Sequence, residues 1–175
     1  ALKEKIRAEI ADYKLLNSEI AFIDPVYLNL DLSLKFTGET NKLRYKDNTQ
    51  LVITKQARAL INEEDLKSKV YNTITSYINN LKLGDIIDVR FLNNEIEKIQ
   101  GIEAIETLRA DKPNNPVPGL SFCVFNPIYN GKDYKTFDTR YQLKPYQIPY
   151  IESPTAFKNK ITIKSLVTNK RVVEY

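Results

Sequence analysis

The sequence contains no histidine, no methionine and no tryptophan, and it has a single cysteine. Without histidine, the chain lacks the ligand sets of common zinc sites and the Ser-His-Asp and Cys-His arrangements of nucleophilic catalysis. Cys123 lies in an apolar run, residues 120–125, where a buried, inert thiol is expected. We therefore expect no catalytic residue, no disulfide within the chain, no metal, no cofactor and no small-molecule substrate.

Long apolar runs are also missing. No stretch approaches the roughly 18 to 20 apolar residues that a membrane-spanning helix needs, and residues 1–5 lack signal-peptide architecture. We therefore expect no membrane partner. Because the chain opens at Ala1 within a helical pattern and contains no methionine, we expect it to be a piece of a longer protein. Its 175 residues suffice for one core with an appendage.

The first part of the chain combines a helical pattern with a strand pattern. Residues 2–15 repeat apolar side chains three and four positions apart, which predicts an amphipathic helix packed by one stripe on a core. After Asp24-Pro25, large apolar side chains alternate with other residues over positions 26–36, which predicts a strand with one aliphatic face. Residues 51–53 are expected to form the returning strand of a long hairpin.

Two capped helices are predicted next. Asn62 is a candidate N-cap for a helix with apolar positions from Leu66 to Leu81, and Gly84 is its expected left-handed terminator. Asp88 is expected to cap a short helix closed by Gly101.

Two further strands complete the pattern. One is predicted over residues 102–108. The second, over residues 120–125, is apolar on both faces and is therefore expected in the middle of a sheet.

The balance of charged groups and the amino-acid composition change after residue 111. Residues 1–111 hold 16 basic and 18 acidic groups, whereas residues 112–175 hold 10 and 4. Seven of the eight prolines and five scattered tyrosines fall between Lys112 and Pro154, without apolar periodicity. This pattern favours an extended arm or ordered loop that gains structure by lying on another surface. Residues 128–156 would then be dispensable for folding.

The order of these elements resembles the C-terminal part of the baseplate J-like family, which includes wedge proteins of contractile-tailed phages. The matching motifs are Ile23-Asp24-Pro25-Val26-Tyr27-Leu28, Leu83-Gly84 after the long helix, and Ile99-Gln100-Gly101-Ile102 before a strand. The resemblance covers roughly residues 1–110. It implies a non-enzymatic structural component of a tail baseplate. Such a component is assembled in the host cytoplasm and is then part of the virion. Its implied partners are other baseplate and tail proteins and a second copy of itself.

The pattern and the resemblance together predict an α+β fold. Residues 1–110 are expected to form a two-layer ferredoxin-like core, with amphipathic helices on one face of a small, largely antiparallel sheet. Residues 111–175 are expected to be an extended Pro/Tyr-rich arm or loop, whose late strands complete the sheet or contact a neighbour.

The tyrosine-rich stretch of the arm is the candidate partner interface, because tyrosine offers large contact area at low entropy cost and proline extends the backbone beforehand. The alternative is a surface loop packed on its own domain. The candidate interface residues are Tyr134, Arg140, Tyr141, Lys144, Tyr146 and Tyr150.

Two other functions are compatible with parts of the sequence. Six acidic residues lie close together in sequence: Asp85, Asp88, Glu95, Glu97, Glu103 and Glu106. Helix caps and solvated faces explain these residues better than a metal site or a glycosidase-type carboxylate pair. The rival function is a basic module that binds single-stranded nucleic acid, which fits a pI near 9. Lysine outnumbers arginine 19 to 7, which argues against bidentate phosphate or base recognition.

Overall fold

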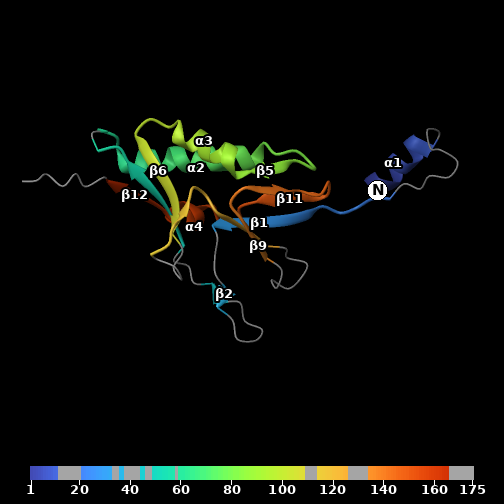
Figure 1. Cartoon of the computed structure of the whole chain (residues 1–175). Coiled ribbons are helices and arrows are strands. Elements are labelled where there is room, and N and C mark those ends of the chain that lie inside the picture. Colours follow the sequence, from blue (N-terminus) through green and yellow to red (C-terminus); the bar gives the residue numbers. More distant parts are fainter. Residues whose placement is uncertain are drawn as a thin grey trace, which may run out of the picture.

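The chain forms an α+β fold of small, mostly antiparallel sheets and four helices in the part that the structure describes (Figure 1). This computed structural model describes residues 1–11, 21–32, 36–37, 44–45, 49–57, 59–108, 114–125 and 134–165. Six of its eight strand pairs are antiparallel, which agrees with the predicted fold class.

The first four-stranded sheet is built around the alternating strand that the sequence predicts. Its order is β11 (Gln147–Tyr150), β1 (Val26–Leu32), β8 (Phe122–Phe125) and β9 (Tyr134–Phe137). Leu28, Leu30 and Leu32 are buried, and the residues between them are at least partly exposed, so the aliphatic face is confirmed. β8 lies between β1 and β9, as its apolar character predicted.

The second four-stranded sheet joins distant parts of the chain. Its order is β12 (Ile161–Ser165), β4 (Gln50–Lys55), β6 (Ile102–Leu108) and β7 (Val117–Pro118). β4 runs parallel to β12 and antiparallel to β6. The predicted hairpin between residues 26–36 and 51–53 is therefore wrong, because β1 and β4 lie in different sheets.

Two short ladders accompany these sheets. β2 (Phe36–Thr37) pairs with β3 (Arg44–Tyr45), and β5 (Ile86–Asp88) pairs with β10 (Arg140–Gln142).

Helix α2 (Glu63–Asn79) begins at the predicted cap, where Oδ1 of Asn62 accepts a hydrogen bond from the Glu64 amide at 2.8 Å. Its buried face consists of Leu66, Val70, Ile74 and Ile78. The helix ends at Asn79, so Gly84 is not its terminator. Gly84 instead occupies a left-handed position, φ +77°, in the turn that leads into β5.

Helix α3 (Val89–Glu97) begins as predicted. Oδ1 of Asp88 accepts hydrogen bonds from the amides of Arg90 at 3.1 Å and Phe91 at 3.2 Å. Gly101 follows the helix with φ +97°, and β6 has the predicted bounds. Helix α2 contacts β11 and β12, α3 contacts β6, and both helices lie on the same side of the strands (Figure 1).

One cluster of buried apolar side chains joins both sheets to α2, α3 and the short helix α4 (Pro154–Asn159). Cys123 is buried in β8, as predicted. Among the fully buried side chains, Phe122 and Phe157 are the largest. At roughly 25 cal/mol per Å² of buried apolar surface, such aromatic side chains contribute strongly to the stability of the core.

The described residues after position 111 supply strands and the short helix α4 to the same body and do not form a separate extended arm, although late strands do complete a sheet, as expected. β9 and β11 complete the first sheet, β12 completes one edge of the second, and Phe137, Leu143 and Phe157 are buried in the same cluster as the earlier helices. Nζ of Lys160 donates hydrogen bonds to Oδ1 and Oδ2 of Asp31 at 3.0 and 2.9 Å, which fixes this part of the chain to β1.

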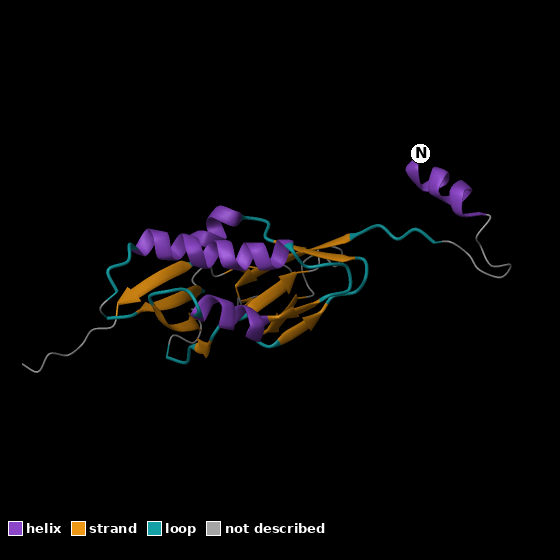
Figure 2. Ribbon diagram, turned by 90° about the horizontal axis from the view of Figure 1, so that it is seen from above, coloured by secondary structure: helices purple, strands orange, loops and turns teal. Residues whose placement is uncertain are grey.

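Helix α1 (Leu2–Ile10) forms where the sequence predicts a helix, but it does not pack on the core. None of its residues is buried, and it stands apart from the body in both views (Figures 1 and 2). The predicted packing of its apolar stripe on the core of the same chain is therefore wrong. The rest of the predicted helix, residues 12–15, lies outside the described residues.

Candidate functional site

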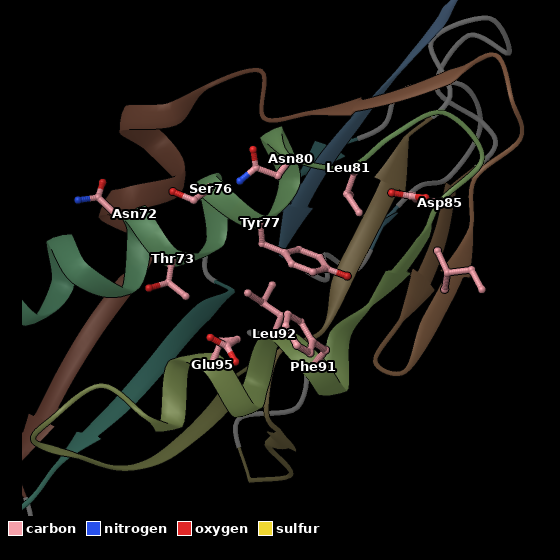
Figure 3. Close-up of a pocket in the computed structure, with 11 residues that line it drawn as sticks. Asn72, Thr73, Ser76, Tyr77, Asn80, Leu81, Asp85, Phe91, Leu92 and Glu95 are labelled. Atoms are coloured by element: carbon pink, nitrogen blue, oxygen red, sulfur yellow. The ribbon is translucent and has the colours of Figure 1, made fainter.

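A groove of about 720 Å³ runs between α2 and α3 and reaches the turn before β5 (Figure 3). Helices α2 and α3 pack against each other. Its lining residues are Asn72, Thr73, Ser76, Tyr77, Asn80, Leu81, Asp85, Ile86, Phe91, Leu92 and Glu95. Apolar and aromatic side chains share this lining with polar ones, which is the composition of a surface that binds another protein segment.

Helical periodicity explains how each helix faces the groove. On α2, Thr73 and Tyr77 are four residues apart, beside the buried stripe that begins at Leu66, and Leu81 follows at the same spacing just beyond the end of the helix. On α3, Phe91 and Glu95 are also four residues apart, and Leu92 closes the bottom of the groove from the buried face. Each helix therefore presents one stripe to the core and a second to the groove.

Tyr77 links the two helices. Its hydroxyl oxygen accepts a hydrogen bond from the Asp88 amide at 2.7 Å, and its ring centroid lies 5.8 Å from that of Phe91. Burial of the phenol, together with the negative charges of Asp88 and Asp85, raises the pKa of Tyr77 above its ordinary value, although the hydrogen bond from the amide opposes this shift. Tyr77 is therefore a neutral anchor of the groove at physiological pH.

Replacing Tyr77 by phenylalanine is expected to lower the free energy of unfolding by about 1–2 kcal/mol, because the partly buried Asp88 amide loses its acceptor. Urea denaturation followed by circular dichroism measures this change. Tyr27→Phe is the matched control on β1, where the tyrosine is half-exposed, and it is expected to change stability by less than about 0.5 kcal/mol. Equal effects of the two substitutions would contradict the role assigned to Tyr77.

The rim of the groove is acidic. Asp85 and Glu95 are the charged residues in its described lining, and neither lysine nor arginine is among these residues. Oδ2 of Asp85 accepts a hydrogen bond from the Lys82 amide at 2.8 Å, and the Asp85 carbonyl accepts one from Leu143 at 3.1 Å. The negative rim at the turn is thus held in place by backbone contacts.

The acidic residues of this region act as caps and ion-pair partners. Asp88 caps α3 and lies 3.6 Å from Nε of Arg140, and Glu95 pairs with Lys98 at 2.8 Å. Within the described ranges, no group of three or more histidine, cysteine, aspartate or glutamate residues is placed to hold a metal ion. The cap interpretation is confirmed for Asp88, whereas Asp85 accepts its hydrogen bond from the Lys82 amide within the turn before β5 and caps no helix.

The structure distributes the predicted interface residues over three places: β10, the segment around β11, and the start of β9. Arg140 and Tyr141 lie on β10, where the Tyr141 ring is 5.2 Å from that of Phe137 and burial raises the pKa of Tyr141. Tyr150 ends β11, 6.0 Å from the ring of Tyr27. Lys144 and Tyr146 lie just before β11. Tyr134 lies at the start of β9, and its side chain is outside the described part of the structure.

Tyr141 is half-buried, so only part of its ring is open to a partner. The set as a whole stays a predicted interface. The groove itself was not predicted, although the four-residue spacing from Thr73 to Leu81 is a second helical stripe visible in the sequence.

Comparison with known proteins adds no family to this description. Neither the protein-family models nor the curated proteins searched include a match to the chain. None of the helices in the described ranges has the length and apolar character needed to cross a membrane.

Proposed function

We propose that this chain is a non-enzymatic structural component of a phage or phage-like tail baseplate wedge, with subunit–subunit assembly as its function. Its partners are other baseplate and tail proteins and a second copy of itself, in the virion after assembly in the host cytoplasm. The proposal requires no cofactor and no small-molecule substrate.

The resemblance to the C-terminal part of the baseplate J-like family supports this proposal. Asp24-Pro25 directly precedes β1, and Leu83-Gly84 forms the turn between α2 and β5. Gly101 separates α3 from β6. In this proposal, α2 and α3 over the antiparallel strands β4 and β6 represent the two-layer ferredoxin-like core of the family.

The observation that argues most directly for assembly is the exposed apolar surface at the groove. Phe91 is 52% exposed and Ile86 44%, and both line the groove, while Leu83 is exposed in the turn beside it. A monomer gains nothing from leaving such side chains in water, and contiguous exposed apolar groups mark protein contact sites.

Two linked measurements test the proposed function. The coding sequences that flank this gene are expected to be a run of tail and baseplate genes. Their products, co-expressed with an affinity-tagged copy of the chain, are expected to be retained with it after purification. Flanking genes of metabolism, together with a tagged chain that retains none of their products, would contradict the proposal.

The alternative function is a basic module that binds single-stranded nucleic acid, favoured by the excess of 10 basic over 4 acidic groups in residues 112–175. Titration of labelled single- and double-stranded oligonucleotides at about 150 mM salt separates the two functions. We expect no saturable binding in the micromolar range, because the described groove has an acidic rim. Micromolar, saturable binding would favour the alternative.

A further inference from the structure

The exposed large apolar side chains fall mainly into two groups on the same chain. One group lies on α1 and the segment after it, and the other lies at the α2–α3 groove. The exposed residues in the described ranges are Leu2, Ile6, Ile23, Tyr27, Leu60, Leu83, Ile86 and Phe91. One group is a convex helix and the other lines a concave groove, so the two have complementary shapes.

Helix α1 has the form of a ligand for such a groove. Leu2, Ile6 and Ile10 are four residues apart and therefore lie on one face. Leu2 is 71% exposed, and no residue of the helix is buried. An isolated helix of nine residues is marginal in water, so α1 gains stability by burying this face against another surface.

The charges of the two surfaces are also complementary. Asp85 and Glu95 are the charged side chains of the groove lining, with Glu95 also paired to Lys98 at 2.8 Å, and Lys3 and Arg7 flank one side of the apolar stripe of α1. Arg7 also lies over the Phe22 ring, 4.9 Å from its centroid. Lys3 pairs with the exposed Asp24 at 2.7 Å, a contact at the surface that contributes little and is readily exchanged. Opposite charges at the edges of a helix and a groove favour one orientation of docking.

We propose that α1 of a second copy of this chain docks in the α2–α3 groove, and that the exchange is reciprocal. Each copy then donates one helix and accepts one, which gives a two-fold dimer with two identical contacts and no unfilled groove. Leu2, Ile6 and Ile10 face Tyr77, Leu81 and Phe91 of the other copy. This inference rests on the proposed assembly function and names the occupant of its interface.

A second copy fits better than the helix of the same chain. Figures 1 and 2 both show α1 away from the body, and residues 21–25 run extended from the start of β1 toward it. The structure thus places α1 where it is presented to a neighbour. Reciprocal exchange covers both apolar surfaces of both copies in one closed assembly.

Cross-linking between engineered cysteines tests the inference. Ile6→Cys is introduced in one tagged copy of the full chain and Ser76→Cys in an untagged copy, while the buried Cys123 is retained. Ser76 lines the groove and is exposed, so its replacement leaves the core intact. Oxidation of the mixture is expected to give a disulfide-linked heterodimer. Adding Phe91→Glu to the Ser76→Cys copy is expected to reduce its yield at least about 10-fold, through loss of an apolar anchor.

The outcomes separate this inference from the proposed function. A chain with both Ile6→Cys and Ser76→Cys that closes on itself as a monomer would assign the groove to its own helix and overturn the second-copy inference. Absence of the heterodimer, or a yield unaffected by Phe91→Glu, would also overturn it. Retention of the flanking gene products in the same preparation would leave the assembly function standing in these cases.

Discussion

Deletion of residues 128–156 is expected to abolish the cooperatively folded state. The deleted segment includes β9, β10 and β11, and two of its side chains, Phe137 and Leu143, are buried in the core cluster. Without β9 and β11, β1 loses its parallel neighbour and β8 loses an antiparallel one, so backbone groups and apolar surface of the first sheet are exposed. Circular dichroism during thermal unfolding is expected to show no sigmoidal transition.

Deletion of residues 1–20 is the control for this experiment. It removes α1, which has no buried residue, and is expected to change the free energy of unfolding of the remaining chain by less than about 1 kcal/mol. A cooperative transition after deletion of residues 128–156, at a temperature similar to that of the intact chain, would contradict this expectation. It would mean that the segment is dispensable for folding.

Replacing Phe157 by alanine is expected to lower the free energy of unfolding by about 3–5 kcal/mol. Phe157 lies on α4, is 1% exposed and has its ring centroid 6.5 Å from that of Tyr71 on α2. Removing the ring leaves a cavity between the two helices. Urea denaturation with a two-state fit measures the loss.

Phe91→Ala is the matched control for Phe157→Ala. The same ring is removed from a half-exposed position on α3, and the expected loss of stability is about 1 kcal/mol or less. Equal losses for the two variants would mean that α4 does not belong to the core. The expected difference also separates the two roles, since Phe157 stabilises the fold whereas Phe91 is assigned to an interface.

Local signals predicted the two helices and the last strand between residues 62 and 108, but not β5. Asn62 and Asp88 cap helices with their own side chains, and the buried positions of α2 repeat every four residues. These features depend on a few neighbouring residues, so they can be recognised without knowledge of the tertiary structure. The strand over Ile102–Leu108 follows for the same reason.

The one strand pairing that was predicted, between residues 26–36 and 51–53, was wrong, because pairing depends on residues far apart in the chain. Ile53 of β4 lies opposite Ile163 of β12, 110 positions later, and Tyr27 of β1 lies opposite Ile148 of β11. Proline content also misled the prediction of an arm. Pro149 lies in β11 and Pro118 in β7, and both are edge strands. Proline cannot donate a backbone hydrogen bond, and an edge strand tolerates it because one side of the strand has no partner.

The sequence did not predict the groove, because the groove also depends on how separate elements pack together. Tyr77 and Phe91 belong to different helices, and their 5.8 Å ring separation results from the packing of α2 on α3. Tyrosines of the predicted strip, in contrast, were conspicuous because of their number. The structure places Tyr141 partly within the core and Tyr150 on an edge strand, and the set as a whole stays a predicted interface.

Sedimentation equilibrium of the intact chain and two variants tests whether the α2–α3 groove is an assembly interface. Phe91 and Tyr27 are both 52% exposed, but only Phe91 lines the groove. Assembly through the groove should give a concentration-dependent dimer of twice the 20.2 kDa chain mass. Phe91→Glu is expected to weaken this dimer at least about 10-fold, and Tyr27→Glu to leave it unchanged. A chain that stays monomeric at all concentrations, or a dimer disrupted by Tyr27→Glu but not by Phe91→Glu, would contradict assembly through the groove.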